Sequence, residues 1–455
     1  MLTTYFIALF VTLNVFYLIL GLIASRSVHS TADYFLAGKN LGLIPVTLTL
    51  VATQIGGGML TGTAQQAYTF GFYGLLYTLG MCIGLTILGL GLASRLQGLN
   101  VGTTAELFEV SYDSPFLRKV ASIFSVITMS GILVAQIIAS RTILHGVGLS
   151  QEWIFIGLWV FIIIYTMTGG LKAVVWTDMA QVLVILGVFG WLLYLSLSSD
   201  PKALFNVKNL FKLQWYFFGN KCIDNNTIAL TIAMPALFSL IEQDIAQRFF
   251  AARSKIVASL SALCSSLILI SFAMIPIYFG MKAKVLGLKV GTGSPLIPVL
   301  SLLTNDFVVA FALCAIMAAI TSTADSVLCA ISSNLAQDFE YRFLKSNTLL
   351  LAQIITCCVG ISAMGASYII PNTIIDTLIS SYSISVCCLL TSLLFAYLGI
   401  RGQKYAAFTS ILAGLVAFIT FSFTPVPFLA IPKEFAALGI SFATYILTLF
   451  VSFIF

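Results

Sequence analysis

Apolar segments long enough to cross a lipid bilayer follow one another along almost the whole chain. A hydrocarbon core of roughly 30 Å requires about 20 apolar residues in a helix, and such windows recur with only short interruptions. Only 8% of the 455 residues are charged, whereas a soluble domain has roughly a quarter of its residues charged. The sequence therefore predicts an all-α integral membrane protein, with the lipid bilayer as its main solvent.

The apolar windows predict thirteen crossings within a single transmembrane domain, 1–455. The first run is too long for the core of a signal peptide and lacks a small-residue cleavage pattern, so we expect a retained, peripheral first helix. The predicted spans are 4–25, 42–67, 71–95, 118–147, 151–168, 174–198, 227–250, 257–282, 306–337, 347–369, 373–398, 403–424 and 433–455.

Basic residues indicate the orientation of the chain. More than half of the 22 lysines and arginines, Arg248 among them, fall in loops on one side if the N-terminus lies outside. Because cytoplasmic loops are enriched in basic residues, we expect an outside N-terminus, a cytoplasmic C-terminus and a location in the cell membrane, specifically a bacterial inner membrane.

Several classes of function are disfavoured. The chain has no Walker glycine loop, which speaks against ATP as the energy source. Its two histidines, His29 and His145, are far apart and do not pair with a serine in a hydrolytic pattern, so we predict that the protein is not an enzyme. The cysteines show no metal-binding spacing. Scattered basic residues predict no nucleic-acid partner, and no obligate protein partner is evident.

The lengths of the spans permit an internal duplication. Spans two to six, 42–198, and spans seven to eleven, 227–398, would form two five-helix repeats, followed by two C-terminal helices in 403–455. Because five is odd, the second repeat would be inverted in the membrane. Inverted repeats place a substrate site near the midplane, where the first helix of each repeat is broken.

Three consecutive glycines, Gly56 to Gly58, lie within the first helix of the first predicted repeat. Each lowers helix propensity by about 1 kcal/mol relative to alanine, so we expect the helix to break here. Backbone carbonyls freed at membrane depth must be buried in protein or bind a ligand such as a dehydrated cation. The alternative is that the glycines only permit close helix packing.

A second polar segment lies in the ninth span. Ala319, Ser322, Thr323 and Ser326 follow the i, i+3, i+4, i+7 spacing of one helix face, and Asp325 lies beside them. Oxygen donors of this kind suit a small hard cation such as sodium. The hydroxyls alone are also explained by hydrogen bonds to the preceding turn, but an acid within a membrane helix is a functional candidate by default.

Two further acidic positions have competing explanations. Asp178 either binds an ion or caps its helix. Glu242 and Asp244 follow a possible kink at Pro235 and either bind solute or ion, or, for Asp244, pair with Arg248 at i, i+4. Glu242 has no such local partner.

Four stretches of the sequence together resemble the sodium:solute symporter family over about Asp33 to Phe339. The family is known for a LeuT-type fold of two inverted five-helix repeats, and this resemblance implies the same fold here. The stretches are Asp33–Leu41, Gly169–Gln181, Gln243–Arg248 with Ala251–Ser254, and Ala318–Ser326.

The resemblance also implies ion sites. A first sodium site would use the carbonyls of Ala52, Ile55 and Ala319 and the hydroxyls of Ser322 and Thr323. A second sodium site of some relatives maps to Asp178, Ser322, Asp325 and Ser326. Asp325 replaces a serine of those relatives, which would strengthen cation binding or let a proton replace the ion.

By the same resemblance, the residues that face the solute are Gln54, Gly58, Met59, Glu242 and Gln243. The thioether of Met59 speaks against a sugar, while amino acids, vitamins and organic acids remain open. The predicted function is secondary active import of a small polar solute by sodium symport with alternating access, Na+ being co-transported. Proton-coupled symport and a non-transporting solute sensor are the alternatives.

Overall fold

The computed structural model describes residues 1–198, 224–290, 294–340, 348–369, 374–399, 403–423 and 431–454, and these residues are almost entirely helical. The longer helices run in the order α1 Leu2–Ser25, α3 Leu43–Gln54, α4 Thr63–Phe70, α5 Leu75–Ile87, α7 Thr104–Tyr112, α8 Pro115–Gly146, α9 Glu152–Ser198, α11 Asn225–Ser239, α12 Gln243–Ala251, α13 Lys255–Val285, α14 Leu296–Leu303, α15 Asp306–Asp338, α16 Thr348–Ala366, α17 Ile374–Tyr397, α18 Lys404–Phe423 and α19 Lys433–Ile454. Short helices include α2 Thr31–Leu36, α6 Ala93–Gly98 and the π-helical turns Gly58–Gly62 and Leu88–Leu92.

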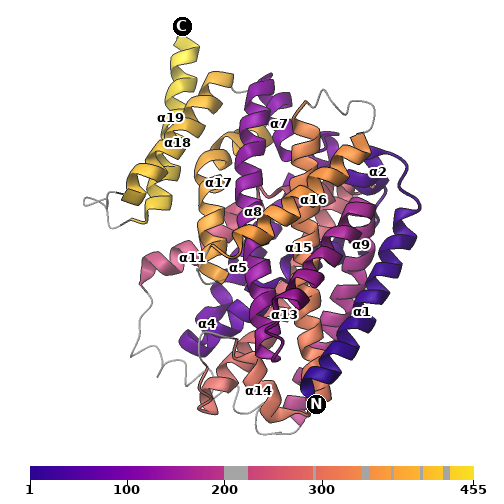
Figure 1. Ribbon diagram of the computed structural model, residues 1–455. Coiled ribbons are helices and arrows are strands. Elements are labelled where there is room, and N and C mark those ends of the chain that lie inside the picture. Colours follow the sequence, from indigo (N-terminus) through magenta and orange to yellow (C-terminus); the bar gives the residue numbers. More distant parts are fainter. Residues whose placement is uncertain are drawn as a thin grey trace.

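Eleven helical stretches in the described part of the chain are long and apolar enough to cross a membrane. One of them, α9, has 47 residues; at about 1.5 Å per residue it is more than twice as long as the hydrocarbon core is thick. It bends at Gly170, where φ is 54° and ψ is −152°, within the predicted link between the fifth and sixth spans. The chain ends lie at opposite ends of the molecule (Figure 1), as an odd number of crossings requires; the count of thirteen itself stays a prediction.

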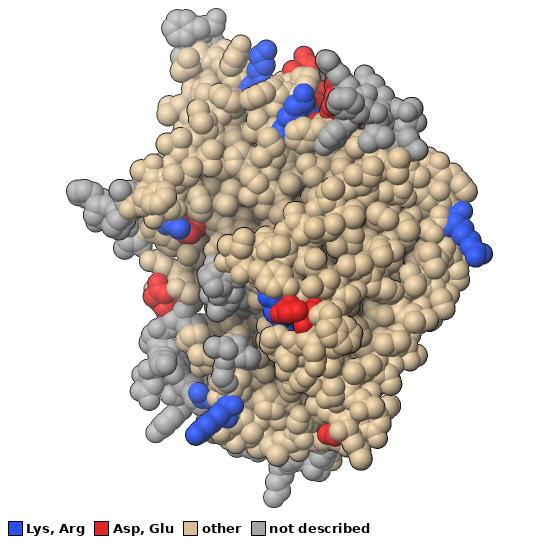
Figure 2. Space-filling model, in the orientation of Figure 1, with Lys and Arg blue, Asp and Glu red and all other residues tan. Residues whose placement is uncertain are grey.

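The outer surface is apolar, as expected for a protein solvated by lipid. Figure 2 shows a face on which uncharged residues dominate and charged side chains occur singly or in small groups. Exposed apolar side chains such as Ile23, Leu90 and Leu183 cover the outside of several spans. The all-helical membrane fold expected from the sequence is confirmed.

Helix α15 forms the centre of the bundle. In its most apolar 18-residue window, 89% of the residues are buried, and the helix packs against α1, α3, α8, α9 and α16. Helix α1 lies along the outside, beside α9 and α15 (Figure 1). The ninth predicted span is thus surrounded by protein, so its polar residues face other helices.

Two glycines let α5 and α11 approach closely. A Cβ on Gly80 would lie 2.2 Å from the carbonyl oxygen of Ile232, and a Cβ on Gly84 would lie 2.6 Å from that of Ala236. The spacing of four residues puts both glycines on one face of α5. Small residues of this kind allow membrane helices to pack backbone against backbone.

Three of the stretches that carry the family resemblance meet along the segment from Tyr34 to Leu41. The Tyr34 hydroxyl donates a hydrogen bond to the Met167 carbonyl (3.1 Å), and Gly170 packs so closely that a Cβ there would lie 2.4 Å from the Tyr34 carbonyl oxygen. The backbone of Leu41 pairs with Ala251 (N–O 3.0 Å) and with the next loop of the chain. These contacts fix the short segment after α1 against the bend in α9 and the end of α12.

Local sequence sets the start of α2. Ser30 and Asp33 form a capping box, and the hydrogen bond from the Ser30 hydroxyl is the largest cause of a lowered pKa at Asp33. A carboxylate at this position also suits the positive end of the helix dipole.

Candidate ion and solute site

The first helix of the first predicted repeat is broken where the sequence places its three glycines. Helix α3 ends at Gln54, Ile55 has non-helical angles (φ −82°, ψ 73°), and a π-helical turn begins at Gly58. A Cβ on Gly56 would lie 2.7 Å from Thr323 Oγ1. The predicted break is therefore confirmed, and the position of Gly56 requires the absence of a side chain.

A glutamine from α8 satisfies part of the broken backbone. The Gly57 N–H donates a hydrogen bond to Gln136 Oε1 (2.9 Å), and Gln136 is buried. Sequence reasoning missed Gln136, because a lone amide within an apolar span carries no signal of what it contacts.

Helix α15 is joined to the end of α3 by two hydroxyls. Ser322 Oγ lies 3.1 Å from the Ala52 carbonyl oxygen and 3.0 Å from that of Ala319. Thr323 Oγ1 lies 2.8 Å from the Thr53 carbonyl oxygen and 3.2 Å from that of Ala319. Each hydroxyl contacts its own preceding turn, as the hydrogen-bonding explanation predicts, and also the broken helix; the role of the two residues as sodium ligands stays a prediction.

The two hydroxyls and the backbone carbonyls that they contact form a buried group of oxygen atoms. Two hydroxyl groups have two protons, but they contact three carbonyl oxygens, so acceptors outnumber donors within the group. The structure thus brings together four of the five residues expected for the first sodium site: Ala52, Ala319, Ser322 and Thr323. The fifth, Ile55, is the first residue beyond α3 and is fully buried.

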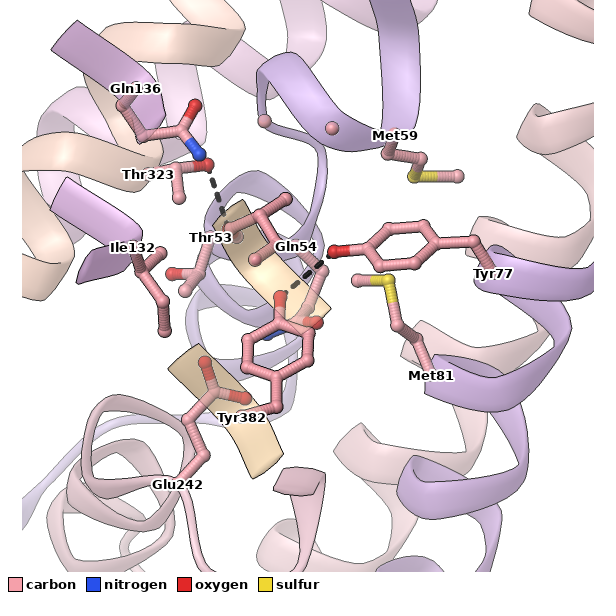
Figure 3. A pocket seen from close by; sticks show the side chains of 13 residues that line it. Thr53, Gln54, Met59, Tyr77, Met81, Ile132, Gln136, Glu242, Thr323 and Tyr382 are labelled. Atoms are coloured by element: carbon pink, nitrogen blue, oxygen red, sulfur yellow. Dashed lines mark hydrogen bonds between the residues drawn. The ribbon is translucent and has the colours of Figure 1, made fainter. Parts of the chain in front are cut away.

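The second predicted broken helix is also interrupted. Helix α11 contains Pro235 and ends at Ser239, and α12 begins at Gln243. Glu242 lies between them with an extended backbone (φ −67°, ψ 123°) and is 7% exposed. The interruption turns the Glu242 side chain toward the glycine break of the first helix (Figure 3).

A small cavity of about 20 Å³ lies between the two breaks, which is room for about one water molecule. Four of the five residues predicted to face the solute line it: Gln54, Gly58, Met59 and Glu242. Two of the remaining lining residues, Gly56 and Thr323, were predicted in other roles, at the helix break and at the first sodium site. The others, which sequence reasoning missed, are Thr53, Tyr77, Met81, Ile132, Gln136, Leu378 and Tyr382.

The fifth predicted residue, Gln243, does not reach the cavity. Its Oε1 accepts a hydrogen bond from the Thr104 N–H (2.6 Å), and its Nε2 lies 3.4 Å from the Gly102 carbonyl oxygen. As the first residue of α12 it points away from its neighbour Glu242, toward the start of α7. Its observed role is to hold these two segments together.

Tyr77 and Tyr382 both line the cavity. Their hydroxyls lie 2.8 Å apart (Figure 3), and the Tyr382 ring stacks on Phe238 with ring centres 4.5 Å apart. Leu378, one turn before Tyr382 on α17, lies 2.5 Å from the position of a Cβ on Gly58. Helix α17 thus closes the cavity with one aromatic and one aliphatic side chain.

Arg248 was expected in a cytoplasmic loop, and that expectation is wrong. It lies in α12 and is fully buried, with Nη2 3.2 Å from Asp178 Oδ2 and 2.5 Å from Ser326 Oγ. Its Nε donates to Thr49 Oγ1 (3.0 Å), and Thr49 in turn donates to Asp178. A cationic side chain therefore contacts two of the residues expected at a second ion site.

The predicted ion pair between Asp244 and Arg248 is absent from the described residues. Arg248 contacts Asp244 only through the backbone, with Nη1 2.8 Å from the Asp244 carbonyl oxygen. The i, i+4 rule applies to side chains that share a helix surface, but here Asp178 offers Arg248 a fully buried partner. Asp178 lies inside α9, beyond the bend at Gly170, and pairs with Arg248, so its explanation as a helix cap is wrong.

Asp325 points to a different neighbour. Its Oδ2 accepts a hydrogen bond from the Tyr165 hydroxyl, and its Oδ1 is buried without a hydrogen-bond partner among the described residues. Of the four residues proposed for a second ion site, Asp178 and Ser326 contact each other through a 3.4 Å hydrogen bond. Asp325 is held instead by α9.

Comparison with known proteins agrees with this architecture. The chain is similar to the solved structure of a Na+-coupled sialic acid symporter in a substrate-bound, outward-open state, with a TM-score of 0.83 at 17% identity, covering 98% of this chain and 97% of that one. It is also similar to a nucleobase-cation-symport-1 family transporter in a closed conformation, with a TM-score of 0.59 at 14% identity, covering 91% and 93%. These likenesses confirm the LeuT-type fold.

Sequence comparison identifies the family directly. The model of the sodium:solute symporter family matches residues 34–414, a range that includes both broken helices, the hydroxyls of α15 and the cavity between them. The chain therefore belongs to the sodium:solute symporter family.

Proposed function

We propose that this protein imports a small polar solute together with Na+ by alternating access. Its sodium site would be formed by Ala52, Ile55, Ala319, Ser322 and Thr323. Sodium-coupled symport follows from the family. The observation that supports the site is the pair of hydroxyl contacts from Ser322 and Thr323 to the carbonyls of Ala52 and Thr53. These contacts join two helices at a point where one of them is broken.

Sodium binding at this point would couple to the conformation. An ion with ligands from both α3 and α15 stabilises the conformation in which these two helices are close together. It shifts the population toward that conformation to the extent that it binds it more tightly than the other conformations. Thr323 also lines the solute cavity. Ion and solute would therefore stabilise the same state, with a reciprocal coupling of roughly 1–3 kcal/mol.

We further propose that one sodium ion accompanies each solute. Arg248 places a fixed positive charge beside Asp178 and Ser326, where a second sodium would otherwise be expected. Charges of like sign repel strongly in a buried environment. Asp178 thus has its counter-ion within the protein, and the second site of some relatives would not bind an ion here.

The solute is proposed to be an amino acid, vitamin or organic acid. Met59 lines the cavity with a thioether, which offers little to a sugar hydroxyl. The orientation proposed from basic residues, with the N-terminus outside and the C-terminus in the cytoplasm of a bacterial cell, would place solute entry on the outer face of the inner membrane.

Uptake into proteoliposomes tests this function. With an inward sodium gradient and no pH gradient, a sodium symporter accumulates radiolabelled solute. A proton symporter that uses Asp325 and Asp178 does not accumulate solute under these conditions. A sensor would bind solute without moving it. Sodium-dependent binding without uptake, or uptake driven only by a pH gradient, would contradict the proposal.

A further inference from the structure

The cavity between the broken helices contains one formal charge. Among its thirteen lining residues, Glu242 is the only carboxylic acid, and there is no lysine, arginine or histidine. Glu242 is 7% exposed. A carboxylate in such a place is costly unless it is paired or hydrogen-bonded. Within the protein the Glu242 carboxyl group contacts the side chains of Gln54 and Asp244, and neither of these is a cation.

The protein does not supply Glu242 with an ion-pair partner among the described residues. The cation nearest along the chain is Arg248, whose ion pair is with Asp178. The remaining guanidinium contacts go to Thr49, Ser326 and the Asp244 carbonyl. Since all three guanidinium nitrogens are engaged in a fully buried network, Arg248 is held away from the cavity.

The other walls of the cavity suit a positively charged group. Tyr77 and Tyr382 present two aromatic rings, and the Tyr382 ring is fixed by stacking on Phe238. Cations are attracted to aromatic faces, the more so when they are desolvated. Met59 and Met81 add polarisable sulfur without a competing donor. In Figure 3, Glu242, Tyr382 and Tyr77 border the same space.

The end of the cavity near Thr323 would be positively charged when sodium is bound. Thr323 lines the cavity and also belongs to the hydroxyl and carbonyl group of the proposed ion site. In Figure 3, Thr323 and Gln136 lie on one side of the cavity and Glu242 on another. With sodium bound, the cavity would have a positive end near Thr323 and a negative end at Glu242.

From these observations we infer that the solute carries an organic ammonium group that binds the Glu242 carboxylate. Among the proposed solutes, a zwitterionic amino acid has the charges that match best, with its ammonium at Glu242 and its carboxylate toward the sodium end near Thr323; binding it requires the cavity of about 20 Å³ to widen. This inference rests on the proposed function, but it is narrower, because sodium symport of an anion or a neutral polyol would satisfy the function alone. Anionic solutes without an amine would face Glu242 with no cation in the lining to offset it.

The test is a sodium-gradient uptake screen in proteoliposomes. Three groups of radiolabelled probes are compared: amino acids and small amines, their des-amino carboxylic acids of the same carbon skeleton, and neutral sugars and polyols. We expect sodium-dependent uptake only in the first group. Sodium-dependent uptake of an acid or polyol, with no competition from any ammonium compound, would overturn the inference and leave the proposed function intact. No sodium-dependent uptake in any group would overturn both.

The variant Glu242→Gln then tests the residue. Because a charge-assisted hydrogen bond is replaced by a neutral one, we expect a roughly 10- to 100-fold rise in the KM of the ammonium solute. Discrimination against the des-amino analogue should fall by a similar factor, with half-activating sodium and thermal stability unchanged. The matched control is Glu152→Gln, at a half-exposed position on the surface, where KM should stay within about twofold. A Glu242→Gln protein that keeps full discrimination would refute the role of Glu242.

Discussion

The Ser322 hydroxyl lies 3.1 Å from the carbonyl oxygen of Ala52, although the two residues are 270 positions apart in the chain. The contact joins the central helix α15 to the last turn of α3 before the glycine break. Thr323 repeats the contact one residue further along, on Thr53. The two hydroxyls are therefore the first place to test the coupling of ion and conformation.

Ser322→Ala and Thr323→Ala should weaken sodium activation more than they weaken solute binding at saturating sodium. Each removes one of the oxygen ligands, so half-activating sodium should rise by roughly tenfold or more, about 1.4 kcal/mol. The measurement is initial uptake against sodium concentration. Ser332→Ala on the same helix, a buried hydroxyl bonded to Leu328 and Thr356, serves as the control. Solute binding that falls as far as sodium activation would argue against this site.

A methyl group added at Gly56 should disturb the proposed sodium site from the side of the broken helix. The added Cβ would lie 2.7 Å from Thr323 Oγ1 and 3.0 Å from Gln136 Oε1, so these two side chains must shift. We expect Gly56→Ala to lose most sodium-dependent uptake while the protein still inserts and folds. Gly187→Ala, where the Cβ has no neighbour within 4 Å, should behave as wild type. Equal uptake by the two variants would show that the close contact at Gly56 has no functional role.

Removing the charge of Arg248 should be strongly destabilising. Arg248→Gln leaves the Asp178 carboxylate buried without its counter-ion, and breaking such a pair costs about 3–5 kcal/mol. The double variant Asp178→Asn with Arg248→Gln should recover part of this loss. Thermal unfolding in detergent measures both. If the effects of the two single variants simply add in the double variant, the pair is not coupled.

The ratio of sodium to solute flux tests the single-ion proposal. Dual-label uptake of 22Na and solute should give a ratio near one. Asp325→Asn should leave this ratio unchanged, because Asp325 is held by Tyr165 and not by Asp178. A ratio near two in the wild type that falls in Asp325→Asn would restore the second sodium site expected from the resemblance.

The sequence was informative wherever a local property determines the structure. Glycine lowers helix propensity at each position, and the break after Gln54 was predicted from residue type alone. Helical spacing likewise put Ser322 and Thr323 on one face of α15. Both rest on intrinsic propensity and periodicity.

Long-range contacts were not predictable in the same way. Arg248 looked like a loop residue because arginine is costly inside a membrane. Its position depends on Asp178, Thr49 and Ser326 from three other helices. Gln136 and Tyr382 are similar cases, since each gains its role only from a neighbour far away in the sequence. Contacts between distant parts of the chain determine these positions, and the spacing of residues along the sequence does not reveal such contacts.

The interlocked glycines of α5 carry a mechanical consequence. Gly80 and Gly84 bring the backbone of α5 against that of α11, so neither helix can rotate past the other without a collision of main-chain atoms. If the chain is a pair of five-helix repeats as proposed, α5 and α11 descend from different halves of the duplication. The rigid body that moves during transport would then contain helices from both repeats. The units that move would therefore differ from the units that were duplicated.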